Sequence, residues 1–124
     1  MKLTKKASEF YESWLGSTHP LEATDPEFME IYLNFLFDDV SSEINLSTYE
    51  RLKITLACLA VIGAKRAYGR LVTAALKNGV KAGEIREILY QAAPYAGFGR
   101  LEEMFYAMNE AFKEAGVALP PANA

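Results

Sequence analysis

Two arginines on one predicted helix are the side chains of this sequence best suited to hold an anion. Arg66 and Arg70 lie in the stretch GAKRAYGRLVTAALKNGV at residues 63–80. They are four positions apart, so a helix places both on one face, and arginine's planar fork suits a carboxylate. The helix start near Ala64 also attracts anions. The pair could therefore grip a small dicarboxylate. The alternative is that both arginines are solvated or pair with acidic side chains: Glu50, Glu84 or Glu87.

A reaction on a bound carboxylate also needs a proton donor, and the candidates are Tyr68, Tyr95 and His19. Tyr95 follows Pro94, which interrupts helical hydrogen bonding, and such irregular helix ends often border pockets. A tyrosine there can equally be a packing residue with a tethered hydroxyl. His19 lies in a loop and is either a surface residue or, where the loop covers a neighbouring subunit's pocket, an imidazole for acid–base chemistry.

Cysteine and histidine usage argues against redox and metal chemistry. Cys58 is the only cysteine, which excludes an intrachain disulfide and a two-cysteine redox pair. It lies in the apolar run ITLACLAVIGA at residues 54–64, where we expect it to be buried and inert. With one histidine and no Cys/His cluster, we expect no metal site and no cofactor.

The overall composition excludes several classes of protein. The 124 residues suffice for one domain, and the 51% of apolar and 23% of charged residues are typical of a soluble globular chain. A net charge of −3 provides no basic surface for nucleic acid. The longest apolar run is too short to cross a bilayer. The N-terminal lysines are not followed by an apolar run, so we expect no signal peptide. We expect a cytoplasmic protein with neither nucleic acid nor membrane as partner.

The apolar periodicity predicts an all-α fold of about six helices. They are expected at about residues 4–15, 25–40, 47–63, 64–78, 82–96 and 99–115. We expect a single domain, made of an N-terminal helix and loop at 1–24, a core at 25–116 and a frayed tail at 117–124.

Several helix ends carry recognisable signals. Asp25 is expected to cap the second helix. Ser47 and Glu50 have the spacing of a capping box for the third helix. Gly79 and Val80 are expected to end the fourth helix in a Schellman motif.

Two helices carry more apolar side chains than one domain can bury. The second helix has one apolar face of Phe28, Ile31, Tyr32 and Phe35, and a second of Met29, Leu33, Leu36 and Phe37. The third helix is apolar almost all round between residues 54 and 62. An amphipathic helix needs only one stripe, so we expect the outer side chains Met29, Leu33 and Leu36 to be buried between subunits. A monomer with a thick core is the alternative.

From about residue 21 to 119 the order of segments resembles the carboxymuconolactone decarboxylase family, which shares its fold with alkylhydroperoxidase D. The matching segments are DPEFMEIYLNF, YERLKITLACLAVIGA and AALKNGVKAGEIREILYQAAPYAGFGRLEE. The resemblance implies an alkylhydroperoxidase D-like helical bundle. It also implies a homo-oligomer, a trimer or hexamer, which would bury the excess apolar surface.

The resemblance also shows where the sequence departs from the family. Peroxidase members have two cysteines, a histidine and a glutamate at positions that, aligned on Gly63, correspond to Ala64, Ala67, Leu71 and Leu52. All four residues are apolar here. Disulfide chemistry needs a thiolate and a resolving thiol, so a thiol peroxidase is disfavoured. The histidine that decarboxylase members keep near Leu71 is also missing.

The resemblance implies a decarboxylase, a carboxy-lyase that acts on a small carboxylated lactone or related anion. Arg66 and Arg70 would bind the substrate, and His19, Tyr68 and Tyr95 are the candidate proton donors. The alternative is a catalytically silent oligomer that binds a small molecule or serves as a scaffold. The two hypotheses differ in whether a titratable group with an oriented partner faces the pocket beside the fourth helix.

Overall fold

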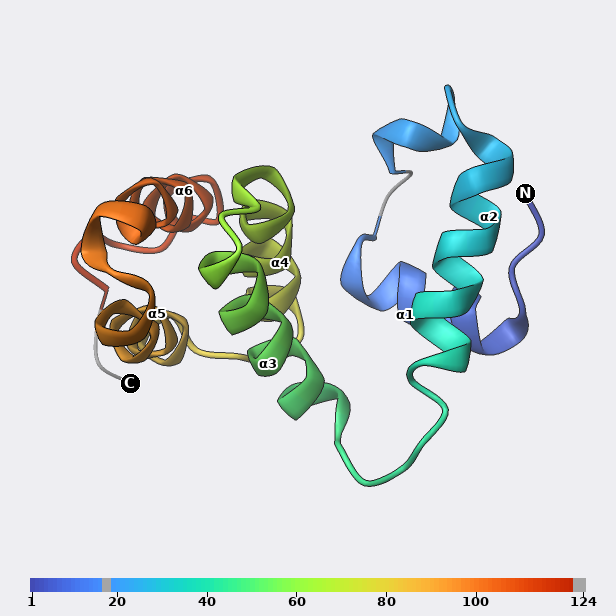
Figure 1. The fold of residues 1–124 in the computed structure, drawn as a ribbon, viewed down its shortest axis with the longest axis horizontal. Coiled ribbons are helices and arrows are strands. Elements are labelled where there is room, and N and C mark those ends of the chain that lie inside the picture. The colour runs from blue at the N-terminus through green and yellow to red at the C-terminus, as the bar shows by residue number, and fades with distance from the viewer. Residues whose placement is uncertain (17–18, 122–124) are drawn as a thin grey trace. The chain divides into compact units, whose positions relative to one another are not determined.

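The computed structural model describes residues 1–16 and 19–121, and these residues form helices and turns with no strand. Six α-helices lie close to the expected ranges, which confirms the all-α prediction. The chain divides into two compact units, unit 1 at residues 1–47 and unit 2 at residues 48–124 (Figure 1). That the whole chain is one domain stays a prediction.

The described residues of unit 1 form two α-helices and two short helical turns. Its elements are α1 (Lys5–Trp14), the 3-10 turn η1 (Pro20–Glu22), α2 (Pro26–Asn34) and the π-helical turn η2 (Phe35–Asp39). Thr4 caps α1, because its Oγ1 accepts a hydrogen bond from the Ala7 N–H at 3.1 Å. Phe10, Trp14 and Phe37 form an aromatic cluster with ring centroids 5.5–6.1 Å apart. This cluster joins α1 to η2.

The prediction of which face of α2 points outward was wrong. Met29 and Leu33 are each only 2% exposed, whereas Phe28, Ile31, Tyr32 and Phe35 are 45–69% exposed. α2 packs on α1 and η2, and the side that carries Met29 and Leu33 is the one buried in unit 1. The unpartnered apolar face of unit 1 is therefore the one that carries Ile31.

Unit 2 is a group of four helices, α3 (Thr48–Val61), α4 (Lys65–Lys77), α5 (Ala82–Ala96) and α6 (Phe98–Glu114). α4 packs on α3 and α6, and α5 packs on the same two helices (Figure 1). The largest fully buried side chains of this core are Leu52, Leu56, Tyr68, Val72, Val80, Ile85, Leu89, Leu101, Met108 and Phe112. Because all four helices share this core, its close packing fixes the position of α4 relative to α6.

α3 is apolar almost all round but is buried on one face only, and the prediction that Cys58 is buried was wrong. Leu52 and Leu56 are completely buried, while Cys58 is exposed and Ile54 and Ile62 are 49% and 64% exposed. Only one face of α3 meets α4, α5 and α6. The other face therefore keeps its apolar side chains and the thiol at the surface.

The turns on both sides of α4 are closed by Schellman motifs. After α4, the Val80 N–H bonds to the Ala75 carbonyl at 2.9 Å and Gly79 adopts a φ of +91°, as predicted. After α3, the Ala64 N–H bonds to the Leu59 carbonyl at 3.0 Å and Gly63 has a φ of +75°. The glycine after α3 lets α4 begin directly, which sets where the first turn of α4 points.

Two smaller expectations about chain ends differ from the structure. Asp25 precedes α2, but its side chain makes no capping hydrogen bond and instead accepts one from Thr24 Oγ1 at 2.7 Å. The tail is not frayed as far as Pro121, which is buried and accepts a hydrogen bond from Arg86 Nη1 at 3.4 Å. The rest of the predicted tail lies outside the described residues, and the Ser47–Glu50 capping box stays a prediction.

Candidate functional site

A groove runs along the contact between α4 and α6 in unit 2, with a volume of about 820 Å³. Its lining consists of Lys65, Arg66, Gly69, Arg70 and Thr73 of α4 and Tyr106, Ala107, Glu110, Ala111 and Glu114 of α6. The small residues Gly69, Ala107 and Ala111 leave room between the two helices. Longer charged and aromatic side chains rise on both sides. The groove thus combines charged side chains with a largely apolar lining, and it is large enough for a small molecule.

Arg66 and Arg70 both face this groove, as their spacing on a helix predicts. Neither forms an ion pair with another described residue, so the predicted pairing with acidic side chains is not seen in that part of the chain. Lys65, which precedes them, does pair with Glu103 of α6 at 3.1 Å between Nζ and Oε2. The two guanidinium groups are therefore the uncommitted cations of the α4 side.

Tyr106 brings a phenol hydroxyl to the α6 side of the groove. Its hydroxyl donates a hydrogen bond to Glu102 Oε2 at 2.9 Å, one helical turn earlier. This bond and the charge of the carboxylate raise the pKa of Tyr106 above its usual value. The phenol is protonated at neutral pH, as an ordinary tyrosine is, and its proton is shared with Glu102.

The three donor candidates named from the sequence lie outside this lining. Tyr68 is 1% exposed inside the core of unit 2, and burial raises its pKa. Tyr95 is 83% exposed near the end of α5. His19 belongs to unit 1, where its Nδ1 accepts a hydrogen bond from the Leu21 N–H at 3.1 Å. The structure thus brings together the two arginines but none of these donors.

Sequence reasoning missed Tyr106, Glu110 and Glu114. The signal that could have found them is their regular spacing of four, which puts all three on one face of α6. That spacing alone does not say which helix lies opposite. Only the packing of α4 on α6 does.

The positions that the family resemblance assigns to reactive residues all carry apolar side chains, two of them buried and two half-buried. Leu52 of α3 is completely buried and Leu71 of α4 is 8% exposed. Ala64 and Ala67, at the start of α4, are half-buried. Hydrocarbon side chains at these four positions provide neither a nucleophile nor a proton relay.

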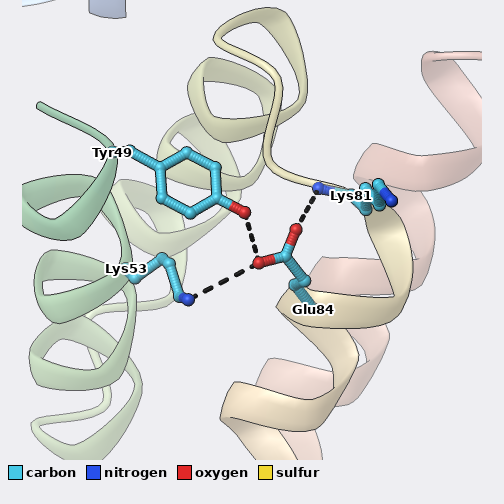
Figure 2. Close-up of polar contacts among 4 residues, drawn as sticks. All are labelled: Tyr49, Lys53, Lys81 and Glu84. Atoms are coloured by element: carbon cyan, nitrogen blue, oxygen red, sulfur yellow. Dashed lines mark hydrogen bonds and ion pairs between the residues drawn. The ribbon is translucent and has the colours of Figure 1, made fainter. Parts of the chain in front are cut away.

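A second polar cluster joins α3 to the start of α5 (Figure 2). Glu84 accepts hydrogen bonds from the Tyr49 hydroxyl and from the Lys81 N–H at 3.2 Å, and its Oε2 lies 3.5 Å from Lys53 Nζ. The Tyr49 bond is the largest cause of a lowered pKa for Glu84. Because Glu84 satisfies the backbone at the helix start and holds α3 beside α5, its role is structural.

Within residues 1–16 and 19–121, no group of three or more His, Cys, Asp or Glu side chains is arranged to hold a metal ion. None of the helices formed by these residues is long and apolar enough to cross a bilayer.

Comparisons with known proteins agree with the resemblance. The sequence profile of the carboxymuconolactone decarboxylase family matches residues 26–110. One similar protein is the 4-carboxymuconolactone decarboxylase of Acinetobacter baylyi. It is 25% identical over 120 residues, which cover 92% of this chain and 90% of that protein. Both matches include the whole of α4 and most of α6.

Proposed function

The chain belongs to the carboxymuconolactone decarboxylase family, and on that premise we propose that it decarboxylates a small carboxylated lactone bound in the α4–α6 groove. The observation that carries the proposal is the pair Arg66 and Arg70, which line one groove and have no ion-pair partner among the described residues. Two such cations favour a substrate that bears carboxylates.

The chemistry needs charge stabilisation and a proton. The bond between the lactone carbon and the carboxylate breaks, its electron pair stays on the carbon side, and CO2 leaves. The negative charge then spreads toward the lactone carbonyl, where a guanidinium group stabilises it. A proton returns to carbon from a donor, and we assign this role to Tyr106, the phenol that lines the groove.

The similar protein of Acinetobacter baylyi supports the choice of substrate, since its name specifies 4-carboxymuconolactone as the compound that loses CO2. That compound is therefore the first to test.

The experiment measures CO2 release from 4-carboxymuconolactone by the wild type and by single variants. Arg66→Ala and Arg70→Ala should each weaken substrate binding about ten- to hundredfold, because each loses a charge-assisted hydrogen bond of about 1.5–3 kcal/mol. Tyr106→Phe should lower kcat and leave KM nearly unchanged, because it removes only the proton donor.

Lys113→Ala is the matched control, since Lys113 is exposed on α6 and does not line the groove. It should leave both kinetic constants unchanged. Equal activity in the wild type and in both arginine variants would overturn the proposal.

The second candidate function is a catalytically silent protein that binds a small carboxylate in the same groove. It is favoured by the buried leucines Leu52 and Leu71 at the family's reactive positions. Calorimetric binding of 4-carboxymuconolactone that depends on both arginines, with no CO2 released above the no-protein rate, would establish this candidate and exclude the decarboxylase.

A further inference from the structure

We propose that the α4–α6 groove selects molecules whose carboxylates lie at one end, and that Glu110 and Glu114 reject molecules with a carboxylate at each end. The inference rests on the proposed function only in taking this groove as the place where a small anion binds. It gives the groove a positive side and a negative side. It also assigns a role to Glu110 and Glu114, which the decarboxylation itself does not use.

The two sides of the groove carry opposite charge. On the α4 side Lys65 is neutralised by Glu103, which leaves Arg66 and Arg70 as the cations available to a ligand. On the α6 side Glu110 and Glu114 line the same groove. Neither carboxylate forms an ion pair with another described residue.

The spacing on each side is one helical turn. Residues four apart on a helix have their Cβ atoms about 5–6 Å from each other, so each side presents a pair of like charges over a short length. Two arginines at that spacing match two carboxylates on the same carbon or on neighbouring carbons. A carboxylate at the far end of the ligand would face Glu110 or Glu114 and would be repelled by their negative charge.

The floor of the groove lets a ligand lie between the two charged sides. Gly69, Ala107 and Ala111 line it, and none of them has a side chain longer than a methyl group. A ligand that extends from α4 toward α6 therefore meets the glutamates directly. The far end of a well-accepted ligand must be neutral or must offer hydrogen-bond donors to these carboxylates.

Dimethylmalonate and glutarate test this polarity, because they are isomers with the same double negative charge at pH 8. The first has both carboxylates on one carbon, and the second has them at opposite ends of a chain. Calorimetry at about 20 mM salt keeps screening weak. The wild type should bind dimethylmalonate about five times more tightly than glutarate, from Coulomb repulsion in a partly solvated groove.

Glu110→Gln and Glu114→Gln should each raise the affinity for glutarate about two- to threefold and leave that for dimethylmalonate within the error of the measurement. Glu87→Gln is the control with the same change of charge, because Glu87 is exposed on α5 and does not line this groove. It should change neither affinity.

The outcomes separate this inference from the proposed function. Dimethylmalonate binding that is lost in Arg66→Ala, together with equal glutarate binding in the wild type and both glutamine variants, would overturn the polarity alone. Binding of neither isomer, or binding that does not depend on the arginines, would remove the groove as an anion site and both proposals with it.

Discussion

Lys65 and Arg66 stand in the first turn of α4, which contains no acidic residue. The N-terminal end of a helix dipole is positive, so each cation there costs about 0.3–1 kcal/mol of helix stability. Both cations also line the α4–α6 groove. Side chains that act against local helix stability and line a groove are typical of functional sites.

Cys58 is a residue whose exposure does not imply a catalytic function. The thiol lies on the outer face of α3, and the chain contains no second cysteine to resolve a sulfenic acid. We therefore expect native protein to react with one equivalent of a thiol reagent such as DTNB, but to show no peroxidase turnover with dithiol reductant and an organic hydroperoxide.

The measurement compares the wild type with Cys58→Ser. The variant should lose the DTNB reaction and give the same peroxide consumption as the wild type and the no-protein control. A saturable peroxidase rate that disappears in Cys58→Ser would contradict this expectation.

At the scale of elements, α2 shows how a neighbouring helix selects one of two apolar faces. Leu33 lies on the face that packs in unit 1 and is 2% exposed. Leu33→Ala should therefore lower the free energy of unfolding of unit 1 by about 2–5 kcal/mol, as expected for a buried leucine. Trp14, the only tryptophan of the chain, is buried in the same unit, so its fluorescence in urea reports the change.

Ile44→Ala is the control for Leu33→Ala, because Ile44 is 93% exposed in unit 1. It should cost no more than about 0.5 kcal/mol. Similar urea midpoints for the two variants would mean that the burial of the inner face of α2 contributes little.

At the scale of the whole molecule, the exposed apolar face of α2 calls for a partner. Phe28, Ile31, Tyr32 and Phe35 are each at least 45% exposed, and contiguous patches of this kind are rare on monomers. Burying each side chain contributes about 1.5–3 kcal/mol. Summed over several copies in a symmetric interface, this free energy can exceed the cost of association. We expect a homo-oligomer, a trimer or hexamer as in the family resemblance.

Light scattering at micromolar concentration measures the mass of this assembly. Ile31→Glu should lower that mass while far-UV circular dichroism stays helical, because the glutamate lies on the outer face. Leu33→Glu should instead disrupt unit 1 itself, because Leu33 is internal. A wild-type mass of 13.8 kDa would contradict the assembly.

Features that depend on neighbours along the chain could be predicted before any tertiary contact was known. The helix ranges follow from apolar periodicity, and the stop after α4 follows from a glycine that alone tolerates a φ of +91°. The common face of Arg66 and Arg70 follows from their spacing. The family, too, could be recognised from local segments such as AALKNGV and PYAGF.

Tertiary structure alone decided which faces meet. The burial of Leu33 rather than Ile31, the exposure of Cys58, and the presence of Glu110 and Arg70 in one groove each depend on residues distant along the chain. Both faces of α2 are apolar, so its pattern permits either orientation, and spacing on α6 does not identify the helix beside it. Packing of whole helices chooses among such options, because it must bury the most apolar surface at once.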